Sequence, residues 1–166
     1  MASKIVNINT NYSDPVVAQN RTAIEHRAAW MGLIFDEVSK VGQDAETITR
    51  KAIARRGDQD GARIAGNTKK PGCVASFAEA FLDDVGKSTF QMDIKEATDT
   101  DLVVEFHYCP LTAAWQKLGF DDERCATLCD LAMEGDRHIA KANGLTLDLT
   151  DTIAKGNPVC KLHFHK

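Results

Sequence analysis

Residues 88–110, STFQMDIKEATDTDLVVEFHYCP, decide the fold class. Apolar and polar residues alternate on both sides of the short polar segment ATDTD, with Phe90, Met92 and Ile94 on one face of the first half. Alternation with a period of two is typical of β-strands, and a short polar connection joins antiparallel neighbours. The stretch therefore predicts a hairpin, followed by a helix that begins at Pro110.

The residues before this hairpin predict helices. Asp-Pro at positions 14 and 15 is typical of a helix start, and apolar residues then recur every three or four positions over about 14–41. A second helix is expected from about residue 44. Its C-terminal half is less regular, because Gly57 and Gly61 each weaken a helix. A third helix is expected over about 74–85.

The residues after the hairpin predict two helices and two more strands. A short helix runs from Pro110 to Gly119, and a longer one from Asp121 or Asp122 to about Asn143. The segments TLDLTDTIAKG and PVCKLHFHK form a second hairpin around KGNP. The fold class is therefore α+β: N-terminal helices followed by a ββααββ unit, with an antiparallel sheet covered by helices. We expect a single domain over 1–166, with an N-terminal extension (1–13), a helical part (14–86) and the ββααββ part (87–166).

Composition limits the function classes. The chain has 166 residues, a net charge of −4 and 27% charged residues, as in an ordinary soluble globular protein. The negative charge argues against nucleic acid or an anionic membrane as a partner. No apolar run reaches the ~20 residues that span a bilayer, and the first residues lack a signal-peptide core. We expect a cytoplasmic protein whose cysteines stay reduced.

The predicted long helix has an unusual inward face. At about 100° per residue, Cys125, Cys129, Ala132, Asp136 and Ile139 fall in one narrow sector. An acidic residue in an apolar stripe is costly unless it is paired, hydrogen-bonded or protonated. Asp136 is therefore either a structural acid, held by a buried arginine or by backbone amides, or a general base or substrate-binding carboxylate.

Four of the five cysteines allow more than one interpretation. Cys109 lies between a strand and a helix N-terminus, whose amide dipoles lower the pKa of a thiol, so it is the candidate reactive thiol. Cys125 and Cys129 share the inward helix face, and Cys160 shares the core face of its strand. The four could also hold zinc, although their spacing lacks tight Cys-x2-Cys pairs, or could be core residues. We expect no bound metal.

The histidines are expected mostly at the surface. His163 and His165 alternate onto the strand face opposite Cys160, so they are surface residues rather than ligands. His107 shares the face of Glu105 and Cys109 in the predicted strand, and is the histidine best placed to work with Cys109.

The second half of the chain also carries a set of short motifs. These are YCPL after a strand, LG, two cysteines four positions apart on a helix, and KGNPVCKLHF near the end. Across about residues 88–166 the set resembles the L-2-amino-thiazoline-4-carboxylic acid hydrolase family. Asn157 stands where that family usually has an acidic residue, and the helical first half has no sharp motif. The matching positions are Cys109, Pro110, Gly119, Cys125 or Cys129, Gly156 and Cys160.

The resemblance implies a fold and a reaction. The fold would be similar to ligand-binding domains of the 4-vinyl-reductase type. The reaction would be the opening by water of a small cyclic amidine that contains a thioether, giving S-carbamoyl-cysteine, with no cofactor. Either a thiolate or a base-activated water would serve as nucleophile. The candidate catalytic residues are Cys109, Asp136 and His107, and the candidate substrate-binding residues are Cys125, Cys129 and Cys160.

Two further expectations concern partners. The alternative function is a small-ligand-binding or sensor domain without catalysis, because a fold does not fix a function. Trp30, Ile34 and Val41 widen the apolar stripe of the first helix, so this face either packs within the domain or joins two copies in a homodimer.

Overall fold

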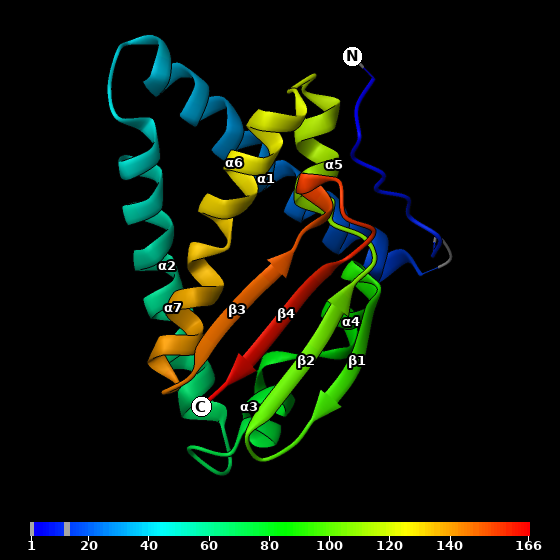
Figure 1. The fold of residues 1–166 in the computed structure, drawn as a ribbon, viewed down its shortest axis with the longest axis vertical. Helices are drawn as coiled ribbons and strands as arrows, with labels where there is room; N and C mark the ends of the chain where they lie inside the picture. Colours follow the sequence, from blue (N-terminus) through cyan, green and yellow to red (C-terminus); the bar gives the residue numbers. More distant parts are fainter. Residues whose placement is uncertain (1, 12–13) are drawn as a thin grey trace.

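Two long helices dominate the N-terminal half of the protein in a computed structural model (Figure 1). The structure describes residues 2–11 and 14–166. Helix α1 (Pro15–Lys40) begins where the Asp14 carboxylate accepts hydrogen bonds from the backbone N–H groups of Val16 and Val17. Such a cap satisfies amides that have no partner inside the helix. The predicted first helix is therefore confirmed.

Helix α2 (Ala45–Asn67) continues without interruption through its glycines. Gly57 and Gly61 are buried against α7 (Glu134–Ala142), and a Cβ at either position would lie within 3 Å of atoms of that helix. Gly57 and Gly61, which have low helix propensity, are thus the residues that let α2 and α7 approach closely.

The third predicted helix is two helices, which corrects the expectation for residues 74–85. Helix α3 (Val74–Phe81) ends at Leu82, and α4 (Asp84–Phe90) starts anew because the Asp83 carboxylate accepts a hydrogen bond from the backbone N–H of Gly86. Helix α4 extends through Phe90, so the prediction that Phe90 lies on a strand is wrong.

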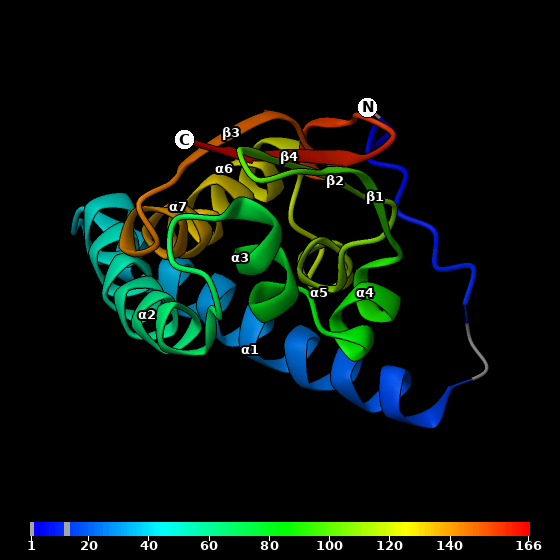
Figure 2. The same ribbon diagram turned by 90° about the horizontal axis from the view of Figure 1, so that it is seen from below.

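The sheet is antiparallel, with the strand order β1-β2-β4-β3. Both predicted hairpins are confirmed, and they join through β2 and β4. The predicted strand TLDLTDTIAKG ends at Asp151, however, and Ile153–Lys155 form a short 3-10 helix. On β4, Leu162 and Phe164 are fully buried beneath the sheet, as expected, whereas Ile94 on the edge strand β1 is 43% exposed and does not face the core. Figure 2 shows the helices on one side of the sheet. The strands are β1 (Met92–Ala97), β2 (Asp101–Phe106), β3 (Thr146–Asp151) and β4 (Cys160–His165).

Of the two helices predicted after the first hairpin, the short one is confirmed and the long one is not. Helix α5 (Pro110–Lys117) has Cys109 as its N-cap residue. The expected long helix is divided at Met133 into α6 (Asp122–Ala132) and α7. A guanidinium nitrogen of Arg137 donates to the backbone carbonyl of Asp130 at 3.0 Å, and a continuous helix would give that carbonyl to the N–H four residues on. Arg137 thus caps the end of α6 at the point where α7 begins.

Residues 2–11 form an extended arm along the start of α5 and α6. The side chain of Asn7 accepts a hydrogen bond from the Cys109 backbone N–H (2.9 Å) and donates one to the Cys109 carbonyl (2.8 Å). The Lys4 backbone N–H donates to the Asp122 carboxylate at 2.7 Å. From α1, the buried guanidinium of Arg21 donates a hydrogen bond to the backbone carbonyl of Asn11 at the end of the arm. The arm is thus part of the wall around Cys109.

Among the described residues, no helix combines the length and the apolar character needed to cross a membrane.

Candidate active site

A cavity of about 270 Å³ lies between the sheet and helices α1, α5, α6 and α7. Its wall is largely apolar, and its charged lining residues are Arg27 from α1 and Asp136 from α7. A concave, mostly apolar site with a few converging polar groups is typical of small-molecule sites. The remaining lining residues are Phe81, Leu82, Gly86, Phe90, Met92, Phe106, Cys109, Leu111, Trp115, Cys129, Ala132, Met133, Cys160 and Leu162.

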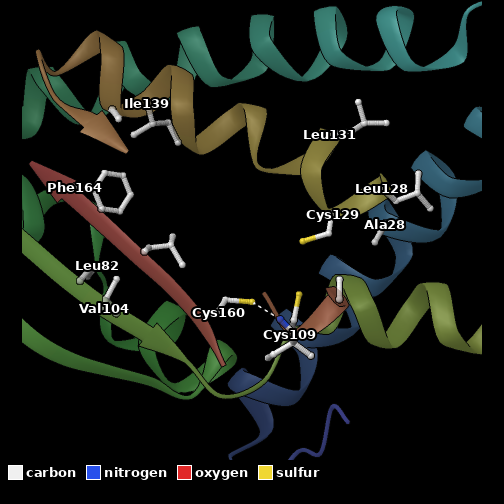
Figure 3. Packing of buried hydrophobic residues seen from close by; sticks show 14 of the residues in the cluster. Ala28, Leu82, Val104, Cys109, Leu128, Cys129, Leu131, Ile139, Cys160 and Phe164 are labelled. Carbon is white, nitrogen blue, oxygen red and sulfur yellow. Dashed lines mark hydrogen bonds between the residues drawn. The ribbon is translucent and has the colours of Figure 1, made fainter. Parts of the chain in front are cut away.

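Three cysteines from different elements meet at this cavity. Figure 3 shows the sulfur atoms of Cys109, Cys129 and Cys160 pointing toward one another, from the start of α5, from α6 and from β4. The Cys160 Sγ accepts a hydrogen bond from the backbone N–H of Ile153 at 3.3 Å. Burial raises the pKa of the Cys160 thiol to about 12, and the pKa of the Cys129 thiol also rises well above its ordinary value through burial. All three are reduced thiols in an apolar wall.

The pKa of Cys109 corrects one expectation. As the sequence predicts, Cys109 precedes a helix, and the backbone amides of Leu111 and Thr112 favour its thiolate. Burial is the larger effect, however, and it raises the pKa of the Cys109 thiol above its ordinary value. At neutral pH the group is therefore a protonated thiol, and the prediction of a thiolate activated by the helix N-terminus is wrong.

Two buried hydroxyl groups lie beside the thiols. The Thr112 hydroxyl is next to Cys109, and the Thr152 hydroxyl is next to Cys129. Neither oxygen forms a regular hydrogen bond with another described residue. Both hydroxyl groups are buried and neither residue lines the cavity, so they act on the thiols and not on a ligand.

Asp136 is the carboxylate of the cavity. It is half-buried, and among the described residues no cation lies within 4 Å of it as an ion-pair partner. Burial raises the pKa of Asp136 to about 6, and the positive charge of Arg27 acts in the opposite direction. A carboxyl group with this pKa is mostly ionised at neutral pH yet accepts a proton readily, as a general base should.

Arg27 is the site residue that the sequence analysis missed. It is exposed at the edge of the cavity, and the charge of its guanidinium acts on both Cys109 and Asp136. Among the described residues, no carboxylate lies within 4 Å of it. The sequence indicates this position, because Arg27 lies three residues after Ile24 and four before Met31, next to the apolar stripe of α1. An arginine without an ion-pair partner beside an apolar cavity is suited to bind a ligand carboxylate.

Two predicted site residues lie elsewhere. His107 does not share a face with Cys109, because β2 ends at Phe106 and the chain turns before Cys109 enters the core. His107 instead lines an open hollow with Asp93 and Gln91. Cys125 is fully buried behind the cavity wall, and its thiol lies 3.8 Å from the carbonyl oxygen of Phe120. The structure therefore brings Cys109, Cys129, Cys160 and Asp136 together, and leaves His107 and Cys125 outside.

Comparison with known proteins shows a match to a protein family. A family model described as L-2-amino-thiazoline-4-carboxylic acid hydrolase matches residues 21–164, a range that contains Arg27, Cys109 and Asp136. No curated protein and no solved structure matches the chain, so the likeness to 4-vinyl-reductase-type domains stays a prediction.

Proposed function

Because this chain belongs to the L-2-amino-thiazoline-4-carboxylic acid hydrolase family, we propose that it hydrolyses a small cyclic amidine that carries a carboxylate. The observation that carries the proposal is that Arg27 and Asp136 both line one apolar cavity. Such a substrate has a carboxylate and a basic amidine, which match these two charges. The cavity is close to the lower end of the range for ligand pockets, roughly 300–1,000 Å³, which suits a small molecule.

In the proposed reaction, water attacks the ring carbon that lies between nitrogen and sulfur. The Asp136 carboxylate accepts one proton from the water as the new C–O bond forms. The same proton then passes to the ring nitrogen as the C–N bond breaks, and the second proton of the former water moves to the released amine. The oxygen of the water becomes the carbonyl oxygen of S-carbamoyl-cysteine, and no oxidant or cofactor is needed. Arg27 holds the substrate carboxylate throughout.

Cys109, Cys129 and Cys160 form the apolar wall against the thioether side of the ring in this proposal. A water nucleophile is favoured over the Cys109 thiol, because the raised pKa keeps that thiol protonated. His107 and Cys125 have no proposed part, since neither lines the cavity.

The direct test is to incubate the protein with 2-amino-thiazoline-4-carboxylate and follow ring opening by mass spectrometry. We expect turnover by the wild type, and a KM raised by about tenfold or more in Arg27→Met, because a charge-assisted contact contributes about 1.5–3 kcal/mol. Arg55→Met, an exposed arginine on α2, is the control and should behave as the wild type. Tight binding of a small molecule without any turnover would instead support a ligand-binding or sensor domain.

Replacing Cys109 by serine separates the two nucleophiles. If water attacks, Cys109→Ser should keep turnover within about tenfold, since the side chain only lines the cavity. If the thiol attacks, its loss should lower kcat by about 10³-fold or more. Cys73→Ser, at a cysteine outside the cavity, is the matched control. A loss of activity confined to Cys109→Ser, with an unchanged melting temperature, would contradict the water mechanism.

We also propose that two copies associate through α1. Trp30, Ile34 and Val41 are 61%, 59% and 71% exposed, so the wide stripe of this helix is not used within the chain. A contiguous exposed apolar face of this kind is often an interface. Sedimentation at micromolar concentration should give a dimer, and Ile34→Glu should give a monomer. We further propose a cytoplasmic role in cysteine metabolism, and the acidic net charge argues against a nucleic-acid partner.

A further inference from the structure

The open face of the sheet carries two histidines on its inner strand β4. His163 and His165 alternate with the buried residues Leu162 and Phe164, so both rings point away from the helices. The two rings lie side by side, with centroids 4.7 Å apart. Two imidazoles two residues apart on a strand present their nitrogen atoms to the same space.

A carboxylate from the neighbouring strand completes the group. Asp148 on β3 is paired directly with His163 in the sheet register, and its carboxylate lies 3.0 Å from Nε2 of His165. One ligand atom from each of Asp148, His163 and His165 lies within 4.8 Å of the other two. Zinc holds nitrogen and oxygen ligands at about 2.0–2.2 Å, so small rotations of the exposed Asp148 and the partly exposed His163 and His165 would close the group around one ion.

Asp101 supports the same arrangement from the other side. Its carboxylate lies 2.8 Å from Nε2 of His163. Histidines that bind metals usually keep a carboxylate contact of this kind through the ring nitrogen that does not bind the ion. The two carboxylates beside the imidazoles also attract a cation.

A second group on the same face is less suited to a metal. Asp93, Glu105 and His107 also have ligand atoms within 4.8 Å of one another. However, the ammonium group of Lys95 forms ion pairs with both Asp93 and Glu105. This cation already occupies the position that a metal ion would need.

We propose that Asp148, His163 and His165 bind one divalent transition-metal ion of the zinc class on the open face of the sheet, which revises the sequence-based expectations that these histidines are not ligands and that no metal is bound. Imidazole and carboxylate ligands suit such ions, and three protein ligands leave a position open to water or to a further ligand. The bound ion would join β3 to β4 directly. The site is on the opposite face of the sheet from the cavity, so the proposal does not depend on the proposed hydrolysis.

The test is a titration of the intact protein with Zn²⁺ alone, followed by competition with a chromophoric chelator. We expect one Zn²⁺ per chain and a higher melting temperature when zinc is present. His165→Ala should weaken binding by more than about 100-fold, since loss of even an outer partner of a metal ligand costs 10–100-fold. Asp148→Asn, a milder change at an exposed residue, should weaken binding and abolish the zinc-dependent rise in melting temperature while leaving the metal-free melting temperature unchanged.

Three controls assign the site. His26→Ala, which alters an exposed ring packed on Trp30, should bind zinc as the wild type does. His107→Ala should also bind zinc as the wild type does. Loss of binding in this variant would assign the ion to Asp93, Glu105 and His107 and overturn the proposal. With Co²⁺ as the probe, intense near-ultraviolet absorption would indicate thiolate ligands and overturn the proposal. Equal zinc affinity in the wild type, His165→Ala and Asp148→Asn would also overturn it.

Discussion

Asp136→Asn is expected to lose turnover by about 10²–10⁴-fold, the contribution that general acid–base catalysis typically makes. The amide has nearly the shape of the carboxyl group, so the cavity keeps its form. It cannot take a proton from water or pass one to a ring nitrogen. In the wild type, turnover should rise with pH through about 6, the pKa of Asp136, because the base works only when it is ionised. Arg27→Met should move this rise to higher pH, because the charge of Arg27 lowers the pKa of Asp136.

The same substitution is expected to stabilise the folded protein at neutral pH. Burial raises the pKa of Asp136 from 3.8 to about 6, so between these two pH values the folded state binds more protons than the unfolded state. Stability therefore falls as the pH rises through this window, and the full cost is present above pH 6. A difference of this size corresponds to about 3 kcal/mol. Since Asn must also be desolvated, we expect Asp136→Asn to gain about 1–3 kcal/mol at pH 7 and little below pH 4.

Denaturant unfolding at pH 7 and pH 4, together with activity assays, measures both effects. Asp58→Asn is a suitable control, because Asp58 is an exposed carboxylate on α2 that contacts His138 of the neighbouring helix α7. It should change neither turnover nor the pH dependence of stability by much. If Asp136→Asn instead keeps its activity and loses about 3–5 kcal/mol, as when a buried ion pair is broken, Asp136 is a structural residue.

Gly57→Ala is expected to destabilise the protein by about 1–3 kcal/mol, the usual cost of overpacking a well-packed interior. A Cβ at Gly57 would lie 2.5 Å from the carbonyl oxygen of Gly135 and 2.7 Å from Cβ of His138. These are atoms of the backbone and the stem of a side chain, so α7 has to move as a whole. Because Gly135 precedes Asp136, we also expect a loss of activity. The melting temperature should fall by roughly 2–4 °C for each kcal/mol.

Gly66 provides the matched control on the same helix. A Cβ there would have no atom within 4 Å, so Gly66→Ala has only the effect of helix propensity. Alanine is favoured over glycine by up to about 1 kcal/mol within a helix, and less near its end. Gly66→Ala should therefore be neutral or slightly stabilising by thermal melting. Equal destabilisation by both substitutions would mean that close packing against α7 is not the cause.

The sequence predicts the element types well because hydrophobic periodicity is a local signal. The hairpins, α1 and the buried face of β4 follow from it directly. The two helix breaks do not, because each depends on where a side chain bonds. Asp83 caps a new helix instead of continuing the old one, and Arg137 takes the carbonyl of Asp130. Neither bond changes the pattern of apolar residues.

For the candidate site too, the sequence predicts what depends on local periodicity and misses what depends on tertiary contacts. The inward positions of Cys129, Asp136 and Cys160 were predictable from helix and strand periodicity, and the structure places all three at one cavity. The position of His107 was not, because alternation applies only while the strand lasts, and β2 ends at Phe106. Burial of the Cys109 thiol, which outweighs the helix N-terminus, depends on packing that only the folded chain provides.

The arm of residues 2–11 has a consequence for the order in which the protein can fold on the ribosome. The partners of Asn7 and Lys4 are Cys109 and Asp122, which are made more than 100 residues later. At about 5–20 residues per second, the arm waits roughly 5–20 s for Cys109 to be synthesised. During this time α1 and α2 can form, but the wall beside Cys109 stays open. The arm is thus made long before its partners and is among the last segments to reach its final place.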